Sequence, residues 1–212
     1  MKMGKLITFE GIDGSGKTTQ ISLLEHRLRK ENIPFITLRE PGSTSISEEI
    51  RRILLRHRQA QLSPIAETLL FVTARTQLVT EQIQPHMKQN KIVICDRYID
   101  STIAYQGYGK GLDVKFLKTL NKFGTYNILP SLTIILDINP KKAAERIVNV
   151  DQDRMESLGL DFFKRVQNGY HQIANEEPKR CVVIDSEKSI VDISKEIFNN
   201  ARKIVRSLDV IT

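Results

Sequence analysis

Five short apolar runs rich in β-branched residues recur along the chain, and each is typical of a strand buried on both faces. They are residues 6–9, 35–38, 92–95, 132–136 and 181–184. The segments between them carry apolar residues at helical spacing, as at Ile21, Leu24 and Leu28, with polar residues at the other positions. Strands that alternate with helices predict an α/β fold, with a five-stranded parallel sheet flanked by helices on both faces.

Polar residues follow several of the predicted strands. Glu10 comes after the first run, residues 39–42 after the second, residues 96–98 after the third and Asp137 after the fourth. Because ligands bind at the carboxyl ends of strands in an open parallel sheet, these residues are expected at one shared site. No linker or repeat marks a boundary, so we predict a single domain over residues 1–212.

A glycine-rich segment separates the first predicted strand from the first predicted helix. Gly11-Ile12-Asp13-Gly14-Ser15-Gly16-Lys17-Thr18 matches the phosphate-binding loop (P-loop) pattern G-x-x-x-x-G-K-[ST] in the required context. Backbone N–H groups of such a loop face phosphate oxygens, its lysine reaches the β- and γ-phosphates, and its final hydroxyl binds Mg²⁺. We therefore predict ATP binding by residues 11–19, with Thr19 included. Kinases, GTPases and motors share the loop, which leaves the reaction open.

The end of the third run narrows the choice of reaction. A GTPase would carry Asp-x-x-Gly after this strand and an Asn-Lys-x-Asp motif later, but the nearest match, Asn121-Lys122-Phe123-Gly124, lacks the aspartate. Instead the run ends in Asp96-Arg97-Tyr98. The carboxylate of Asp96 can hold Mg²⁺ through water, and the guanidinium of Arg97 can bind an acceptor phosphate. A purely structural ion pair is the alternative.

Four further motifs accompany the P-loop and the 96–98 triplet. They are residues 39–42 (Arg-Glu-Pro-Gly), residues 71–75 (Phe-Val-Thr-Ala-Arg), residues 101–107 (Ser-Thr-Ile-Ala-Tyr-Gln-Gly), and Leu136-Asp137 followed by Pro140 and Arg146. In their order and spacing the chain resembles thymidylate kinases from about residue 5 to about residue 192. The resemblance implies a P-loop NTPase fold and an enzyme of dTTP synthesis that transfers the γ-phosphate of MgATP to dTMP, giving dTDP and ADP. Another nucleoside monophosphate kinase or a deoxynucleoside kinase is the alternative.

The resemblance also implies roles for individual residues in binding dTMP. The Phe71 ring would stack on thymine, Arg75 would hydrogen-bond the base, and Tyr105 would disfavour a ribose 2′-OH. Asp13 would hold the 3′-OH, and Arg97 and Arg51 the 5′-phosphate. The full predicted set is Asp13, Glu40, Arg51, Phe71, Arg75, Arg97, Ser101, Thr102, Tyr105 and Gln106. Without the resemblance, Phe71 is a core aromatic, and Arg51 and its neighbour Arg52 are residues of a solvated helix face.

Residues 139–160 form a polar stretch in which the strand and helix pattern lapses, and they predict a lid. A cation that closes over ATP can meet the charge of the transferring phosphoryl group and exclude water. The P-loop contains no arginine, so the resemblance implies that the lid supplies it. Arg154 matches the lid arginine best, with Arg146 and Arg165 as alternatives, although a lone arginine in a polar loop is usually only solvated. The predicted catalytic residues are Asp13, Lys17, Arg97 and Arg154, and the predicted Mg²⁺ ligands are Thr18 and Asp96.

Composition limits the partners. Thirty-two Lys and Arg against 25 Asp and Glu give a net charge of +7, which suits anionic ligands. The basic residues are dispersed and only 6% of residues are aromatic, so we expect no nucleic-acid partner, and a nucleotide-dependent DNA-binding protein is the weaker alternative. No apolar run approaches the roughly 20 residues that span a bilayer, and residues 1–5 lack a signal-peptide pattern. We expect no membrane partner, a cytoplasmic location, reduced Cys95 and Cys181 in the core, and, by the resemblance, a homodimer.

Overall fold

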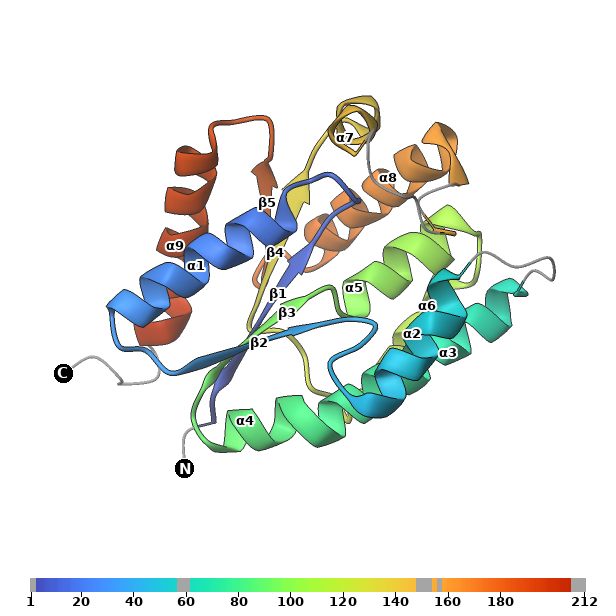
Figure 1. Ribbon diagram of the computed structural model, residues 1–212. Coiled ribbons are helices and arrows are strands. Elements are labelled where there is room, and N and C mark those ends of the chain that lie inside the picture. The colour runs from blue at the N-terminus through green and yellow to red at the C-terminus, as the bar shows by residue number, and fades with distance from the viewer. Residues whose placement is uncertain (1–2, 57–61, 148–153, 156–157, 207–212) are drawn as a thin grey trace.

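A five-stranded parallel sheet forms the centre of the computed structural model, which describes residues 3–56, 62–147, 154–155 and 158–206 (Figure 1). The strands lie in the order β2-β3-β1-β4-β5. Their bounds are Lys5–Glu10 for β1, Phe35–Arg39 for β2, Ile92–Asp96 for β3, Leu132–Asp137 for β4 and Cys181–Asp185 for β5. All five predicted strands are confirmed, and each extends by one polar residue at its carboxyl end.

Helices cover both faces of the sheet. Their bounds are Lys17–Lys30 (α1), Ser45–Leu55 (α2), Pro64–Leu78 (α3), Gln84–Lys88 (α4), Ile99–Thr102 (α5), Val114–Gly124 (α6), Pro140–Arg146 (α7), Leu160–Glu176 (α8) and Ile190–Arg206 (α9), with π-helical turns at Val79–Ile83 (η1) and Ile103–Gly109 (η2). Helices α1 and α9 pack together on one face, and α3, α4, α6 and α8 lie on the other (Figure 1). The predicted doubly covered α/β fold is confirmed.

Successive side chains of each buried strand point to opposite faces of the sheet, so both faces are apolar and both are covered by helices. Ile7 and Phe9 of β1 pack in the core beneath α1 and α9, whereas Leu6 packs on the opposite side with residues of η1 and α4. The register pairs Phe9 of β1 and Arg39 of β2 with Asp96 of β3. The polar strand ends predicted from the sequence therefore lie along one edge of the sheet.

The predicted lid region requires one correction. Residues 139–160 do not lack regular structure throughout, because α7 occupies Pro140–Arg146 and α8 begins at Leu160. The side chain of Asn139 accepts a hydrogen bond from Lys141 N at 2.9 Å, and proline stands at the first helical position. Residues 148–153 and 156–157 lie outside the described residues.

Two smaller expectations concern the cysteines and the membrane. Cys95 and Cys181 are buried free thiols in the core, as predicted. Among the described residues, every helix is either too short or too polar to cross a lipid bilayer.

Candidate active site

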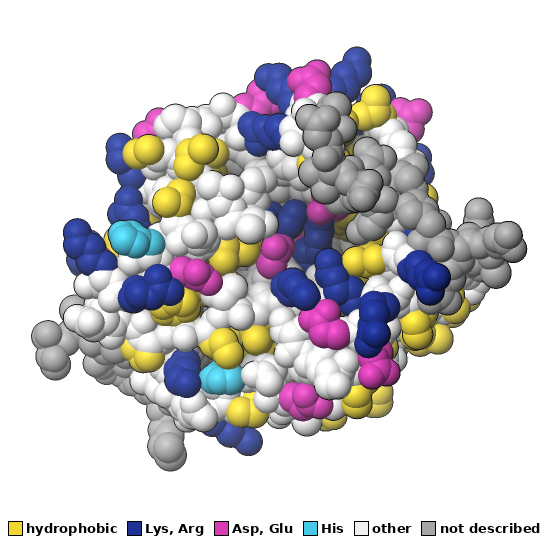
Figure 2. Space-filling model, viewed as in Figure 1, with side chains coloured by type: hydrophobic (Ala, Val, Ile, Leu, Met, Phe, Trp, Pro, Cys, Tyr) yellow, Lys and Arg dark blue, Asp and Glu magenta, His cyan; other side chains and the backbone are white. Residues whose placement is uncertain are grey.

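A cavity of about 690 Å³ opens at the carboxyl edge of the sheet. Figure 2 shows this hollow with Lys and Arg side chains gathered in and around it. Most of the predicted site residues line it, namely residues 13–19, Glu40, Arg51, Phe71, Arg75, Asp96, Arg97, Ser101, Thr102, Tyr105 and Gln106. The structure thus brings together residues that are up to 93 positions apart in the chain.

The P-loop wraps the buried ammonium group of Lys17. Lys17 Nζ donates hydrogen bonds to Gly11 O at 3.0 Å and to Ile12 O at 3.1 Å. Burial lowers the pKa of Lys17, and the nearby Arg97 lowers it further. Gly14 has a φ of +78°, and a Cβ there would lie 2.5 Å from Ala143 O of α7, so only glycine fits. The ammonium group of Lys17 therefore lies in the loop that binds phosphate oxygens in proteins with this motif.

Arg97 and Asp13 form an ion pair beside the P-loop. Arg97 Nη2 lies 2.6 Å from Asp13 Oδ1, and Lys17 Nζ lies 3.8 Å from the same oxygen. Burial alone would raise the pKa of Asp13, but Arg97 and Lys17 outweigh it and lower that pKa to about 2. Arg97 Nη1 also donates to Gly11 O at 3.0 Å. Asp13 is therefore a carboxylate at neutral pH.

A buried glutamate, Glu10, lies behind this ion pair. Its carboxylate accepts hydrogen bonds from Tyr98 N at 2.8 Å, Ser101 Oγ at 2.6 Å and Tyr170 Oη at 3.0 Å. Burial, with a contribution from the charge of Asp100, raises the pKa of Glu10 to about 7. The role of Glu10 could not be predicted from the sequence, and neither could the contact of Tyr170, which reaches this cluster from α8. The only sequence signal for Tyr170 was an apolar position on a helix, which predicts packing and no more.

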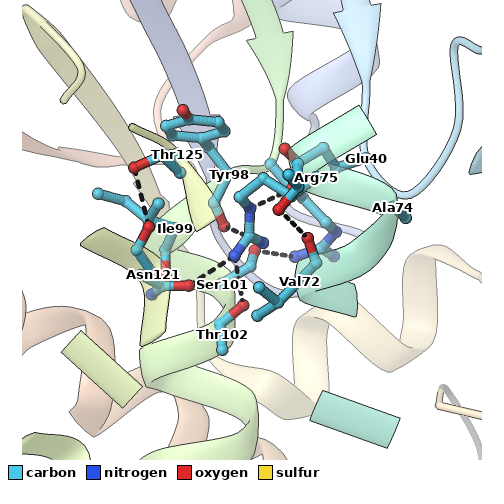
Figure 3. A network of polar contacts seen from close by, with 12 residues as sticks. Glu40, Val72, Ala74, Arg75, Tyr98, Ile99, Ser101, Thr102, Asn121 and Thr125 are labelled. Carbon is cyan, nitrogen blue, oxygen red and sulfur yellow. Dashed lines mark hydrogen bonds and ion pairs between the residues drawn. The ribbon is translucent and has the colours of Figure 1, made fainter. Parts of the chain in front are cut away.

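Arg75 is the centre of a second buried network (Figure 3). Its Nε donates to Glu40 Oε2 at 2.7 Å, and its Nη1 donates to Thr102 Oγ1 at 2.9 Å and to Asn121 Oδ1 at 2.7 Å. Its Nη2 donates to Tyr98 O at 3.0 Å. In the sequence, Asn121 of α6 is distinguished only by its place in the incomplete GTPase motif. In the structure, its Oδ1 accepts a hydrogen bond from Arg75 and so helps to hold the guanidinium in place.

Phe71 and Arg51 complete the far wall of the cavity. Phe71 and Arg75 are one helical turn apart on α3, and both side chains line the cavity. Of the adjacent arginines 51 and 52, Arg51 lines the cavity and donates to Pro41 O at 2.8 Å, whereas Arg52 is exposed. Tyr105, on η2, packs against Phe162 and Tyr170, and its hydroxyl is buried without a hydrogen-bond partner among the described residues.

The three candidate lid arginines lie in different places. Arg154 pairs with Glu67 of α3 and donates from Nε to Leu54 O at 2.9 Å, and it is not among the residues that line the cavity. Arg146 lines the cavity and donates to Gly14 O at 3.3 Å and to Ser186 O at 3.1 Å. Arg165 donates to Gly109 O at 3.1 Å. Arg146 therefore contacts the P-loop directly.

The residues predicted to bind Mg²⁺ fit a cation that is held mainly by phosphates and water. Thr18 and Asp96 both line the cavity, and Asp96 Oδ1 is buried without a hydrogen-bond partner among the described residues. Within the described ranges there is no cluster of three or more His, Cys, Asp or Glu side chains that could hold a metal alone. Such a site matches Mg²⁺ bound through one or two protein groups and nucleotide phosphates.

A parallel P-loop fold whose phosphate loop opens into a cavity also lined by Arg51, Arg75 and Arg97 defines a P-loop kinase. The thymidylate kinase family model matches residues 9–197. The thymidylate kinases of Thermoanaerobacter sp. (strain X514) and Kosmotoga olearia are each 44% identical to the chain, over 94% and 90% of it and over 98% and 92% of those proteins. The chain belongs to the thymidylate kinase family.

A solved structure agrees. The crystal structure of thymidylate kinase from Ehrlichia chaffeensis superposes with a TM-score of 0.75 at 35% identity, covering 94% of this chain and 99% of that one. The predicted family, P-loop NTPase fold, thymidylate kinase function and phosphotransferase class are therefore confirmed, and the alternative kinase acceptors are not favoured.

Proposed function

We propose that the protein transfers the γ-phosphate of MgATP directly to dTMP in the cavity at the sheet edge, giving dTDP and ADP. The observation that carries this proposal is the Asp13 to Arg97 ion pair, which joins the P-loop to the end of β3 in the same cavity that Phe71 and Arg75 line. A donor phosphate on the loop and an acceptor phosphate at Arg97 would then be adjacent. Positioning and charge neutralisation supply most of the catalysis in such a transfer.

Each residue has a separate task in the proposed reaction. Lys17 and Arg97 exchange their present oxygen partners for phosphate oxygens and stabilise the charge of the transferring group. Asp13 accepts from the 3′-OH of the acceptor, and Arg51 binds its 5′-phosphate together with Arg97. When bound at Thr18 and Asp96, Mg²⁺ neutralises charge on the ATP phosphates.

The remaining proposed roles concern the residues around the thymine base and the lid arginine. The ring of Phe71 stacks on thymine, and Arg75, Ser101, Thr102 and Gln106 surround the edge of the base, while Glu40 orients Arg75. Arg154 remains the proposed lid arginine, with Arg146 and Arg165 as alternatives. Arg154 would have to leave Glu67 in order to reach ATP.

We also propose a cytoplasmic homodimer without nucleic-acid or membrane partners. Helices α3 and α6 pack against each other and expose large apolar side chains outside the cavity, among them Ile65 (59% exposed), Phe116 (55%) and Phe123 (83%). A surface of this kind suits association with a second copy. Two buried free thiols suit a reducing compartment.

The test measures acceptor dependence. The purified protein is incubated with MgATP and, separately, with dTMP, dUMP, thymidine, AMP or no acceptor, while ADP release and the phosphorylated product are followed. Rapid dTDP formation with little ATP loss in the blank is expected. ATP turnover that is indifferent to dTMP would refute the proposal.

A further inference from the structure

Glu67, on α3, is a fully buried carboxylate that does not line the cavity. It accepts hydrogen bonds from Gln106 Nε2 at 2.9 Å and from Lys110 Nζ at 2.7 Å, and it pairs with Arg154. Burial would raise the pKa of Glu67, but the hydrogen bonds from Lys110, Gln106 and Arg154 outweigh it and lower that pKa. Glu67 is therefore an ionised acceptor at neutral pH.

The charge of Glu67 fixes which way the Gln106 amide faces. A carboxylate only accepts hydrogen bonds, so Gln106 must turn its NH₂ group toward Glu67 and not its oxygen. No hydrogen bond within the described part of the chain involves Gln106 Oε1. Since Gln106 lines the cavity, its amide offers an acceptor to a ligand there.

We propose that Glu67 is a positioning residue that sets the preference for a pyrimidine base with a donor at N3. Thymine and uracil carry an N3–H, which can donate to Gln106 Oε1. Cytosine carries an acceptor at N3, which would face the same oxygen and leave two buried acceptors opposed. Glu67 thereby prevents the amide flip that would accommodate cytosine. This inference rests on the proposed function.

The experiment compares three acceptors: dTMP and dUMP differ only in the C5 methyl group, whereas dCMP differs from dUMP at C4 and N3. The kcat/KM values for dTMP, dUMP and dCMP are measured for the wild type, Glu67→Gln, Gln106→Leu and the double variant. If dCMP turnover is too slow, its competitive inhibition constant replaces kcat/KM. Glu177→Gln is the matched control, because Glu177 also pairs with an arginine, Arg180, but lies outside the cavity lining.

Glu67→Gln is expected to lower the dTMP-to-dCMP ratio about tenfold, because an amide at residue 67 permits both orientations of Gln106. The dTMP-to-dUMP ratio should not change, since both bases carry N3–H. In the Gln106→Leu background the Glu67 substitution should have no further effect on the dTMP-to-dCMP ratio, and Glu177→Gln should match the wild type.

Two outcomes would show that Glu67 has only a structural role and would overturn the inference. One is an equal loss of kcat/KM with all three nucleotides. The other is an effect of Glu67→Gln on the dTMP-to-dCMP ratio that is as large in the Gln106→Leu background as in the wild type. If Glu67→Gln does not fold, Gln106→Leu alone carries the test, and an unchanged dTMP-to-dCMP ratio refutes it. An inactive wild type would refute the proposed function itself, whereas an active wild type with unaltered ratios in the variants would refute only the role of Glu67.

Discussion

The two ends of the cavity hold their cationic side chains in different ways. At the base end, Arg75 is bound by side chains and backbone from three separate segments, through Glu40, Tyr98, Thr102 and Asn121. At the phosphate end, Lys17 is bound by two carbonyls of its own loop. The base end is therefore preorganised by distant parts of the fold, whereas the partners of Lys17 are local groups that phosphate oxygens can replace. The residue proposed to contact the base is thus held in a fixed position, whereas Lys17 can exchange its partners for phosphate oxygens during transfer.

The largest effect should come from the phosphate end. Lys17→Met removes the cation from the P-loop, and we expect kcat to fall about 1000-fold because one preorganised charge at the transferring group is lost. Single-turnover dTDP formation measures this loss, and a thermal melt checks folding, which should survive because Asp13 retains Arg97. A variant with near-normal kcat would show that the P-loop lysine is not a catalytic residue.

A substitution at the base end should lower both the stability of the protein and its affinity for the acceptor. Asn121→Leu leaves one N–H of Arg75 buried without an acceptor, which should cost about 1–3 kcal/mol of unfolding free energy. The KM for dTMP should rise while the KM for ATP stays unchanged, and urea unfolding with initial-rate kinetics would measure both. Equal increases in the two KM values would break the distinction between the two ends.

The adjacent residues Arg51 and Arg52 provide a matched pair of variants for testing the proposed site of the acceptor phosphate. Arg51→Gln should raise the KM for dTMP about tenfold, because a charge-assisted hydrogen bond to phosphate is lost. Arg52→Gln is the control, since Arg52 is exposed and absent from the cavity lining. If Arg52→Gln raised the KM as much as Arg51→Gln, a general loss of surface charge would explain both.

The last prediction concerns the pH dependence of stability. The pKa of Glu10 is raised by burial from 4.5 to about 7, so the folded protein holds this proton more tightly than the unfolded chain. Its contribution is fully present below the unfolded pKa and is lost as the pH rises through about 7. Wild type should therefore lose stability relative to Glu10→Gln across this range, by at most about 1.4 kcal/mol per pH unit. Parallel curves of unfolding free energy against pH would contradict the raised pKa.

Much of this architecture could be predicted from the sequence, because its signals are local. The apolar runs predict the strands, and the eight consecutive residues from Gly11 to Thr18 carry the whole P-loop pattern. The supporting residues Asn121, Tyr170 and Glu67 could not be found in this way. Asn121 is 46 positions from the arginine that it holds, and no spacing rule connects two residues that meet only after folding. Helix α7 was missed because it is short and its polar surface resembles a loop.

The Arg75 network has a practical consequence for the design of inhibitors. An arginine has five N–H groups, and the protein itself uses four of those of Arg75. A compound that enters the base end can therefore gain only one hydrogen bond from this residue without disrupting the network. A heterocycle with a single carbonyl acceptor facing Arg75 should be favoured over a carboxylate, whose second oxygen would be desolvated without a donor.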